Sequence, residues 1–389
     1  MSAPPISLLL VSYSYPPVLG GSEMEAQRVC GELVRRGYRV KVLCAGLPAM
    51  PHAAEFADPG GVPVRILGRG CESGRLDRAF ALGVAWTLWK ERREYRLVYF
   101  LMQGLHLAAG LPVARLLRKP VVMKVSGSSL ITAMRGSFLG RLELRWLRKW
   151  VPQVMVLNPG MADEAVAAGL RPEQLRWMPN PDDTTEISPR GPAERLELRA
   201  GLGVPAGAPV AIYVGRLAPE KELGSLLGGF AAVARQFPAA LLVLVGDGPE
   251  SGRLQARAAS LGLGALVRFT GRVTIPEVRQ WLRVSDVFAL VSSNEGFPCS
   301  LGEAMATGLP SVVSGIPANL QLIDDSVHGL HAALRDETSI AEALARLFSD
   351  PALGARMGEA ARRRVIENYS TGKVVDRYEA LFAEALGGK

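Results

Sequence analysis

Cysteines are few in this chain of 389 residues: Cys30, Cys44, Cys71 and Cys299 lie far apart and form no Cys-x-x-Cys pair. This scarcity argues against a disulfide framework and a structural zinc site, and it favours a reducing, cytoplasmic environment. Long apolar runs are also missing, because none reaches the roughly 18–20 residues that a membrane-spanning helix requires. The apolar run 6–13 has no basic segment before it, so we interpret it as a buried strand rather than as part of a signal peptide.

Several catalytic and cofactor-binding motifs are absent as well. The sequence has no His-Glu-x-x-His, no Gly-Lys-Ser/Thr phosphate loop and no Gly-x-Ser-x-Gly. The segment "LVGDGPESG" (244–252) places two glycines after a strand, but Pro249 and the spacing do not fit the dinucleotide fingerprint. The pairs Asp182–Asp183 and Asp324–Asp325 suit turns or helix starts better than a metal-diphosphate site. We therefore expect neither a bound metal nor an organic cofactor.

Acidic residues are scarce in one stretch of the chain. Residues 101–150 hold nine Lys or Arg against one Asp or Glu, so this stretch alone carries a charge of +8, which is the formal net charge of the whole chain. Such a concentration of positive charge predicts an anionic partner. We do not expect that partner to be a nucleic acid, because no RNA- or DNA-binding motif accompanies the charge.

Within the basic stretch, residues 134–152 interleave cations with large apolar side chains. The cations are Arg135, Arg141, Arg145, Arg148 and Lys149, and the apolar residues include Phe138, Leu142, Trp146 and Trp150. One interpretation is a helix that lies on an anionic membrane surface, as basic aromatic helices do. The other is an ordinary helix with one face in the core and one solvated basic face. The sequence leaves both interpretations open.

Short apolar runs that alternate with longer helical patterns are abundant. We expect strands at 6–13, 40–45, 62–67, 97–102, 120–125 and 154–157 in the first half, and at 210–215, 241–246, 267–271, 287–291 and 311–314 in the second. Solidly apolar strands separated by helices are typical of parallel sheets covered on both faces. The sequence therefore predicts the α/β class with two doubly wound, Rossmann-like parallel-sheet domains. The Pro- and Gly-rich stretch 179–209 is the expected linker, which gives domains of 1–185 and 186–371.

Ligands of open parallel sheets bind at the carboxyl ends of the strands, where three segments carry suggestive residues. In "YVGRLAPEKEL" (213–223), Arg216 and Lys221 follow a strand that ends at Gly215. Arg presents a planar fork of donors and Lys a mobile charge, and together they suit a diphosphate. A solvated turn with surface cations is the alternative.

The second segment, "NEGFPCSLGEAMATG" (294–308), is a loop followed by a helix that we expect to begin near Ser300. Free backbone N–H groups at a helix start bind anions. Ser300 and Glu303 match a capping box, which explains Glu303 without a ligand, although a carboxylate has enough acceptor sites to cap a helix and bind a ligand together. Glu295 precedes the helix, and no cap explains it. A carboxylate in this loop can bind sugar hydroxyls.

The third segment, "PVLGGSEMEAQ" (17–27), places Gly20 and Gly21 between the first strand and its helix. Residues without side chains let a ligand approach the backbone closely. A simple turn is the alternative interpretation.

Taken together, these segments resemble the retaining glycosyltransferases of family 4, the glycosyl transferases group 1. The resemblance runs through GGSE (20–23), PNPDD (179–183), GRLAPEK (215–221), VGDGPE (245–250), VRFTGRV (267–273), SDVFAL (285–290) and EGFPCSLGEAMATGLP (295–310). It covers nearly the whole chain, and the two glutamates eight residues apart are its most specific part. The resemblance implies the GT-B fold, with two domains facing a central cleft and a final helix, 372–389, that crosses back onto the first domain. It also implies a hexosyltransferase that uses a nucleotide-diphosphate sugar.

The resemblance implies a role for each matching residue. Arg216 and Lys221 would hold the donor diphosphate and neutralise the leaving group, while Glu295 would contact the transferred sugar. Glu303 would bind the ribose hydroxyls. Further donor contacts would come from Gly20, Gly21, Asn180, Gly215, Arg272, Val273, Phe297, Pro298, Cys299, Ser300 and Leu301. A front-face mechanism would need no metal and no protein nucleophile, because a phosphate oxygen accepts the proton of the acceptor.

One position departs from the family pattern. Where many members carry a histidine after a strand of the first domain, "MKVSGSS" places Ser126. A serine can hydrogen-bond a sugar hydroxyl or a phosphate but carries no charge at neutral pH. His106, after the strand that ends in "YFLMQG", is the second candidate catalytic residue of this domain. An ordinary helix-start residue is the alternative interpretation for His106.

The resemblance leaves the substrates open. The donor base can be that of UDP or GDP, and the acceptor can belong to polysaccharide, glycolipid or natural-product synthesis. A lipid-linked acceptor would agree with a peripheral location on the inner face of the membrane through residues 134–152. Two alternatives remain: a nucleotide-sugar epimerase with the same fold, and a catalytically silent nucleotide-sugar-binding protein, which Ser126 makes conceivable.

Overall fold

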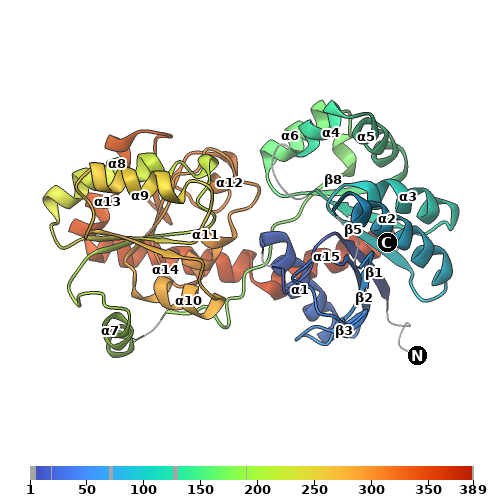
Figure 1. Ribbon diagram of the computed structural model, residues 1–389, viewed down its shortest axis with the longest axis horizontal. Coiled ribbons are helices and arrows are strands. Elements are labelled where there is room, and N and C mark those ends of the chain that lie inside the picture. The colour runs from blue at the N-terminus through green and yellow to red at the C-terminus, as the bar shows by residue number, and fades with distance from the viewer. Residues whose placement is uncertain (1–5, 19, 70–72, 126–129, 190, 388–389) are drawn as a thin grey trace. The chain divides into compact units, whose positions relative to one another are not determined.

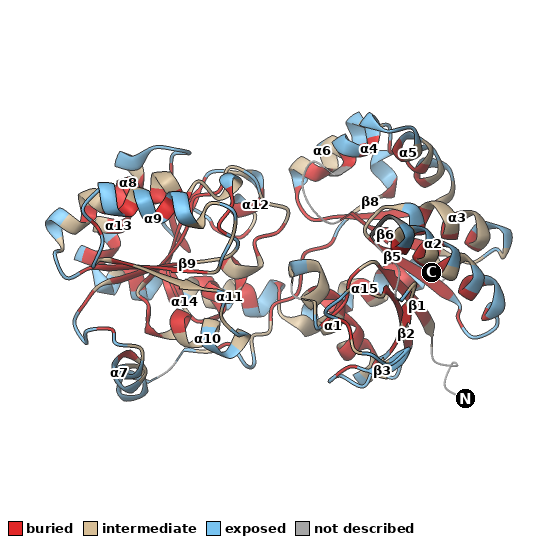
Figure 2. Cartoon of the chain, viewed as in Figure 1, coloured by how far each residue is buried: buried red, intermediate tan, exposed pale blue. Residues whose placement is uncertain are grey.

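The computed structural model of the chain describes residues 6–18, 20–69, 73–125, 130–189 and 191–387. The contacts of the chain divide it into two compact units, Met1–Pro181 with Thr371–Lys389, and Asp182–Ser370. Figure 1 traces the elements of each unit along the chain, and Figure 2 shows which of them are buried. The predicted boundary after residue 185 lies slightly beyond this division, and the final helix belongs to the first unit.

The first unit contains an eight-stranded sheet in the order β3-β4-β2-β1-β5-β6-β7-β8. Its strands are β1 (Ser7–Ser12), β2 (Arg39–Ala45), β3 (Glu55–Ala57), β4 (Pro63–Leu67), β5 (Leu97–Leu101), β6 (Val121–Lys124), β7 (Gln153–Val156) and β8 (Leu175–Trp177). The short edge strand β3 runs antiparallel to β4, and the other described pairs are parallel. All residues of the central strand β5 are buried, as expected for a sheet covered on both faces.

The helices of the first unit lie on the two faces of this sheet. They are α1 (Gly21–Arg35), α2 (Ser73–Lys90), α3 (Leu105–Leu116), α4 (Leu130–Gly136), α5 (Phe138–Trp150), α6 (Pro159–Ala167) and α15 (Thr371–Ala385), with a short 3₁₀ turn η1 (Pro172–Gln174). The basic stretch 134–152 is therefore two helices rather than one. It breaks at Ser137, whose Oγ accepts a hydrogen bond from the N–H of Gly140 at 2.9 Å and caps α5.

A buried polar network fixes α15 to the rest of the first unit. Lys124, at the end of β6, is fully buried and donates to Glu25 of α1, to Asn180 Oδ1 at 2.9 Å and to the hydroxyl of Tyr378 at 3.3 Å. The Tyr378 hydroxyl in turn donates to Glu25 at 2.6 Å, and it lies 3.1 Å from the Tyr99 hydroxyl. A buried charge is tolerated only when it is paired and hydrogen-bonded, so this network specifies where α15 docks.

The second unit contains a six-stranded parallel sheet in the order β11-β10-β9-β12-β13-β14. Its strands are β9 (Val210–Val214), β10 (Leu241–Val245), β11 (Val267–Gly271), β12 (Val287–Leu290), β13 (Ser311–Ser314) and β14 (Gly329–Ala332). Its helices are α7 (Pro192–Gly201), α8 (Leu223–Gln236), α9 (Ser251–Ser260), α10 (Ile275–Val284), α11 (Cys299–Ala306), α12 (Pro317–Leu320), α13 (Glu337–Ser349) and α14 (Pro351–Asn368), with a short 3₁₀ turn η2 (Pro219–Lys221).

Each sheet has one point at which its strand order reverses. In the first unit β1 lies between β2 and β5, and in the second unit β9 lies between β10 and β12. Open α/β sheets bind ligands outside the carboxyl ends of the strands at such a point. The prediction of two doubly wound, Rossmann-like parallel-sheet domains is thus confirmed, and these two reversal points are where the site residues are to be sought.

Candidate functional site

The turn after β9 presents Arg216 at the carboxyl end of the strands of the second sheet. Gly215 has a φ of +154°, and a Cβ atom there would lie 2.7 Å from the hydroxyl oxygen of Tyr213. That hydroxyl donates to the Arg216 carbonyl at 2.8 Å and so fixes the turn. The Arg216 side chain is 66% exposed and donates to Glu220 Oε1 at 2.8 Å. Its guanidinium group is therefore oriented but remains largely accessible to a ligand.

Two strand ends meet in an ion pair beside this turn. Lys221 follows β9 and Glu295 follows β12, and Lys221 Nζ lies 2.7 Å from Glu295 Oε1. The Ser292 hydroxyl donates to the same carboxylate oxygen at 2.7 Å. The two loops are also joined through their backbones, since the N–H of Ser293 donates to the Glu220 carbonyl at 2.9 Å. The structure therefore brings Arg216, Lys221 and Glu295 to the reversal point of the second sheet.

The glycines of "VGDGPE" support the same turn. Gly246 has a φ of +131°, and a Cβ atom at this position would lie 2.0 Å from the Gly215 carbonyl oxygen. The N–H of Gly215 donates to the Val245 carbonyl at 3.0 Å, and that of Leu217 donates to the Asp247 carbonyl at 3.0 Å. Close packing of two neighbouring turns thus explains the Gly-Asp-Gly pattern without a dinucleotide.

Helix α11 begins next to Glu295 without a capping side chain. It starts at Cys299, Pro298 occupies the N-cap position, and no side chain accepts a hydrogen bond there. The capping box expected from Ser300 and Glu303 is therefore wrong, because the helix begins one residue earlier than predicted and Ser300 lies inside it. The positive end of the α11 dipole is therefore available to bind an anionic ligand.

The remaining predicted donor contacts of this unit have mixed exposure. Phe297 is buried against the ring of Tyr369, with 6.0 Å between ring centroids. Leu301 is buried as well, whereas Ser300 and Glu303 are half-buried. Arg272 is exposed and Val273 half-buried directly after β11, whose last residue is tied to the neighbouring turn because the N–H of Gly246 donates to the Gly271 carbonyl at 3.0 Å.

The first unit has a small hollow at its own reversal point. The hollow, with a volume of about 170 Å³, is lined by residues after β1 and β5 and on α2: Tyr13, Asp77, Phe80, Gln103, Gly104, Leu105 and His106. The Tyr13 hydroxyl donates to Asp77 Oδ1 at 2.6 Å. The Oε1 atom of Gln103 is buried and accepts no hydrogen bond from the described residues. The hollow thus offers hydrogen-bond acceptor atoms of Asp77 and Gln103.

His106 is buried in this hollow and is uncharged at neutral pH. Only 3% of its surface is exposed, and burial lowers its pKa to about 4. Its Nε2 atom lies 3.3 Å from the Met102 carbonyl, and the rings of Phe80 and Phe100 lie beside it. His106 can therefore donate or accept a hydrogen bond, but it does not supply a positive charge.

The other predicted residues of the first unit lie in different places. Gly20 precedes α1 and Gly21 begins it. Asn180 belongs to the buried network around Lys124. Ser126 lies outside the described residues. Glu143, which the sequence did not single out, is buried on α5 and accepts a hydrogen bond from the backbone of Gly104, and burial raises its pKa to about 7.

Sequence reasoning also missed Ser292, Tyr13 and Asp77. Tyr13 stands directly after β1 and Ser292 two residues after β12, and a place just beyond an apolar strand is the one signal that could have identified them. Asp77 lies on a helix far along the chain, and only the folded unit brings it to the end of β1.

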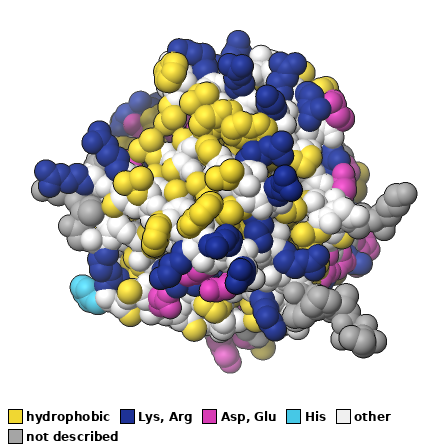
Figure 3. Space-filling view, turned by 90° about the vertical axis from the view of Figure 1, so that its right-hand side faces the viewer, with side chains coloured by type: hydrophobic (Ala, Val, Ile, Leu, Met, Phe, Trp, Pro, Cys, Tyr) yellow, Lys and Arg dark blue, Asp and Glu magenta, His cyan; other side chains and the backbone are white. Residues whose placement is uncertain are grey.

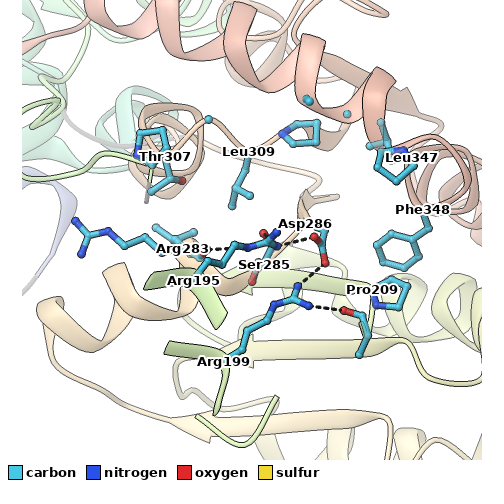
Figure 4. A pocket seen from close by; sticks show the side chains of 18 of the residues that line it. Arg195, Arg199, Pro209, Arg283, Ser285, Asp286, Thr307, Leu309, Leu347 and Phe348 are labelled. Carbon is cyan, nitrogen blue, oxygen red and sulfur yellow. Dashed lines mark hydrogen bonds and ion pairs between the residues drawn. The ribbon is translucent and has the colours of Figure 1, made fainter. Parts of the chain in front are cut away.

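A larger hollow lies at the amino ends of the strands of the second sheet. It has a volume of about 530 Å³, and Figure 4 shows Arg195 and Arg199 pointing toward Asp286 within it. Arg195 lies 2.6 Å and Arg199 2.8 Å from this carboxylate, which also accepts from the N–H of Val210 at the start of β9. Arg199 further donates to the carbonyls of Ala206 and Ala208. These bonds attach α7 to the sheet, so the arginines are explained by the fold.

Doubly wound sheets with cations, a carboxylate and an uncapped helix start at a reversal point are typical of α/β proteins that bind phosphorylated ligands. The sequence model described as Glycosyl transferases group 1 matches residues 194–364, and that described as Glycosyl transferase 4-like domain matches residues 20–181. The chain belongs to the group 1 glycosyltransferases and is an enzyme of this type.

Curated relatives agree with this assignment. The chain is 28% identical to the 2-deoxystreptamine N-acetyl-D-glucosaminyltransferase of Streptomyces fradiae over 388 residues, which cover 90% of each chain. It is 31% identical to the N-acetyl-alpha-D-glucosaminyl L-malate synthase of Bacillus anthracis over 196 residues, which cover 50% of each chain. The chain thus spans about half the length of this second relative.

Solved structures share the fold. The Anabaena protein Alr3699/HepE in complex with UDP and glucose has a TM-score of 0.79 and 21% identity, with 97% of this chain and 100% of that chain covered. The sucrose-phosphate synthase of Thermosynechococcus elongatus has a TM-score of 0.82 and 18% identity, with 98% and 99% covered. In the part of the chain that the structure describes, no helix has the length and hydrophobicity needed to cross a bilayer, and no three His, Cys, Asp or Glu side chains cluster in a way that could hold a metal ion.

Proposed function

We propose that this glycosyltransferase uses a nucleotide-diphosphate sugar, with UDP or GDP as the nucleotide, and binds the diphosphate beside β9. The ion pair of Lys221 and Glu295 is the observation that carries this proposal, because it joins two strand ends at the reversal point next to the accessible Arg216. A solved structure of the same fold binds UDP and glucose, which supports a nucleotide sugar as the donor class.

The chemistry that these groups can perform is the stabilisation of a departing diphosphate. Arg216, Lys221 and the uncapped start of α11 place positive potential where negative charge develops as the sugar leaves. We propose a metal-independent front-face reaction with retention of configuration. In this reaction a phosphate oxygen takes the proton of the acceptor hydroxyl, the acceptor oxygen bonds to the anomeric carbon, and the nucleoside diphosphate departs.

The carboxylates have separate tasks in this proposal. Glu295, oriented by Ser292 and Lys221, hydrogen-bonds hydroxyls of the transferred sugar. Glu303, half-buried one turn into α11, binds the ribose hydroxyls. Neither residue acts as a nucleophile.

The hollow of the first unit is the proposed place for the acceptor. Asp77, held by the Tyr13 hydroxyl, and the unpartnered Oε1 atom of Gln103 are hydrogen-bond acceptors, so they suit a molecule that presents hydroxyl or amino groups. Two relatives that match over about 90% of the chain are named 2-deoxystreptamine N-acetyl-D-glucosaminyltransferase and Alpha-D-kanosaminyltransferase. These names favour a polyhydroxylated natural product over a polysaccharide.

The membrane contact proposed for residues 134–152 has a weaker basis. In α5 the apolar residues Leu144 and Leu147 are buried, whereas Arg141, Arg145 and Arg148 are exposed. Trp146 and Trp150 are half-buried and stack on each other with 5.3 Å between ring centroids. This arrangement gives α5 a basic outer face and buries part of its apolar surface, while Phe138 at its start is 78% exposed.

Donor turnover tests the proposal. A thermal-shift screen against UDP and GDP sugars identifies the donor, and the release of nucleoside diphosphate then measures its turnover. We expect Glu295→Gln to lower turnover by about a hundredfold or more while nucleotide binding persists, because the sugar loses a charged partner but the diphosphate does not. The matched control is Glu337→Gln, which removes an ion pair with Arg257 elsewhere in the same unit and should turn over like the wild type.

The alternatives give different results in the same assays. A silent binding protein would show a thermal shift without nucleotide release. An epimerase would change the donor sugar without an acceptor. Wild-type turnover by Glu295→Gln would remove Glu295 from the site and contradict the proposal.

A further inference from the structure

Helix α2 has an unusual outer face. Its exposed positions Arg75, Arg78, Leu82, Trp86 and Trp89 follow one another at intervals of three or four residues, so they form one stripe along the helix. Leu82 is 69%, Trp86 65% and Trp89 46% exposed. The side of the helix that faces water thus carries two tryptophans and a leucine, where a surface helix normally carries polar residues.

Helix α3 packs beside α2 and continues this apolar surface. Its inner face is formed by His106, Leu107, Gly110, Leu111 and Ala114, all of them buried. The outer positions are Leu105, Ala108, Ala109, Pro112, Val113, Arg115 and Leu116. Leu116 is 71% exposed, and Arg115 is the only charged residue of the helix. A helix that is apolar on all sides is normally enclosed by protein or lipid.

Cations surround these apolar residues. Lys90, Arg92 and Arg93 follow the stripe of α2, and Arg92 lies over the ring of Trp89 at 5.3 Å. Arg115 and Arg118 stand at the end of α3, and both are exposed. Figure 3 shows this pattern on one face of the molecule, where hydrophobic side chains gather with Lys and Arg around and between them. We call the exposed residues of α2 and α3, with these flanking cations, the α2–α3 platform.

Among the described residues of the platform and its flanks, Glu94, directly after Arg92 and Arg93, is the exposed carboxylate. Glu91 is buried and pairs with Lys41 at 2.9 Å and with Arg65, so it faces the sheet rather than the platform. Asp77 is occupied by the Tyr13 hydroxyl. The platform therefore combines an exposed apolar centre with a surrounding excess of positive charge.

We infer that the α2–α3 platform docks on a membrane surface rich in anionic phospholipids. Tryptophan side chains prefer the interface between headgroups and acyl chains, and Lys and Arg are attracted to anionic headgroups. The platform offers both at one surface, with two exposed tryptophans beside exposed arginines. Docking buries the apolar centre and neutralises the surrounding cations together.

The charge pattern favours lipid over a second copy of this chain. A face-to-face dimer through the platform would bring the cations of both copies together, and like charges at an interface oppose association. An anionic bilayer presents the complementary charge over the whole surface.

Vesicle co-sedimentation of the full chain tests the inference. The probes are vesicles of phosphatidylcholine alone and vesicles that also contain phosphatidylglycerol. We expect binding to the anionic vesicles only. We expect this binding to weaken when salt is raised from about 0.05 M to about 0.5 M, because salt screens the attraction between the arginines and the anionic headgroups. An absence of binding to the anionic vesicles at low salt would overturn the inference.

Substitutions locate the surface. Trp86→Ser/Trp89→Ser should reduce the vesicle partition coefficient at least about tenfold, because two interfacial anchors are lost. Leu196→Ser, which replaces a 52% exposed leucine on α7 of the second unit, should bind vesicles like the wild type. Thermal stability and donor turnover should be unchanged in both variants, which separates lost docking from misfolding and from any failure of the proposed function.

A variant that removes positive charge gives an independent test of the docking surface. Arg75→Gln/Arg78→Gln/Arg93→Gln leaves the apolar centre in place and should still weaken binding to anionic vesicles. Unchanged vesicle binding by both platform variants would place the lipid contact elsewhere and overturn the inference. So would a wild-type chain that self-associates in sedimentation velocity and becomes monomeric in Trp86→Ser/Trp89→Ser, because a second copy would then cover the platform.

Discussion

The ends of β9 and β12 in the second unit and the hollow beside β1 in the first occupy the same topological position in two sheets of the same type. In the second unit this position carries Arg216, Lys221 and Glu295, with an ion pair of 2.7 Å that links two strand ends. In the first unit it carries Tyr13, Asp77 and a buried His106 whose pKa is lowered to about 4. The same topological position thus carries two cations and a carboxylate in one unit, and a carboxylate beside an uncharged histidine in the other.

The units also differ in where they place a lysine–glutamate ion pair. The first unit encloses Lys124 and Glu25 in its core, where the pair fixes α15. The second unit places Lys221 and Glu295 at the sheet edge, where their side chains are 17% and 10% exposed. Both lysines stand at or after a strand end, so the pairs differ in burial. The enclosed pair serves stability in the first unit, and for the more accessible pair of the second unit we propose a role in ligand binding.

The largest expected effect is on the stability of the first unit. Lys124→Met should lower the free energy of unfolding by about 3–5 kcal/mol, because it leaves the Glu25 carboxylate buried without its cation. Urea denaturation measures the change. Lys41→Met is the control: Glu91 keeps Arg65 as a partner there, so we expect a loss below about 1 kcal/mol. Equal losses in both variants would contradict a special role for the buried network.

The corresponding change in the second unit should affect the reaction rather than the fold. Lys221→Met should lower transfer by about a hundred- to a thousandfold, since one group that stabilises the departing diphosphate is lost. Steady-state kinetics with the identified donor measures it, and Arg257→Met, which breaks the pair with Glu337, serves as the control. If Lys221→Met instead unfolds the protein and spares the activity of what remains folded, the contrast between the two pairs disappears.

A pH dependence of stability should arise from Glu143, which is buried on α5 of the first unit. Burial raises the pKa of Glu143 from 4.5 to about 7, so the folded chain keeps a proton that the unfolded chain loses as the pH rises between these values. The wild type therefore loses stability as the pH rises. The free energy of unfolding of Glu143→Gln, relative to that of the wild type, should increase by about 2 kcal/mol between about pH 5 and pH 8. Urea denaturation across this range checks the sign. A stability difference between Glu143→Gln and the wild type that decreases with rising pH would contradict the raised pKa of Glu143.

The smallest effect concerns the acceptor. Asp77→Asn should raise the acceptor KM by about tenfold with little change in kcat, because a charge-assisted hydrogen bond to the acceptor becomes a neutral one. The donor KM should stay the same. A change in the donor KM alone would show that the hollow of the first unit does not bind the acceptor.

Much of the fold could be predicted from the sequence because the central strands are apolar on both faces. All eleven expected strands are present, and the missed strands β3, β8 and β14 are short segments such as "EFA", "LRW" and "GLHA", which carry no solid apolar run. The break at Ser137 was missed because a cap within a basic stretch depends on one hydrogen bond.

The site was less predictable than the fold. Residues after strands could be named, but their pairing depends on strand order, which local patterns do not contain. The link between Lys221 and Glu295 requires β9 and β12 to be neighbours although the whole of β10 and β11 lies between them in sequence. The exposure of the tryptophans of α2 could not be predicted, since only the folded unit shows which side of that helix faces water.

Calorimetric titration of UDP and of GDP tests the central claim, that the second unit grips a diphosphate at the end of β9, most directly. The titrations use the wild-type chain, Asp77→Asn and Arg216→Met/Lys221→Met. We predict that one nucleotide binds the wild type and Asp77→Asn alike, and binds the double variant roughly a hundredfold more weakly, since two charged hydrogen-bond donors are lost. Equal binding by the double variant, or no uptake of either nucleotide by the wild type, would contradict the account.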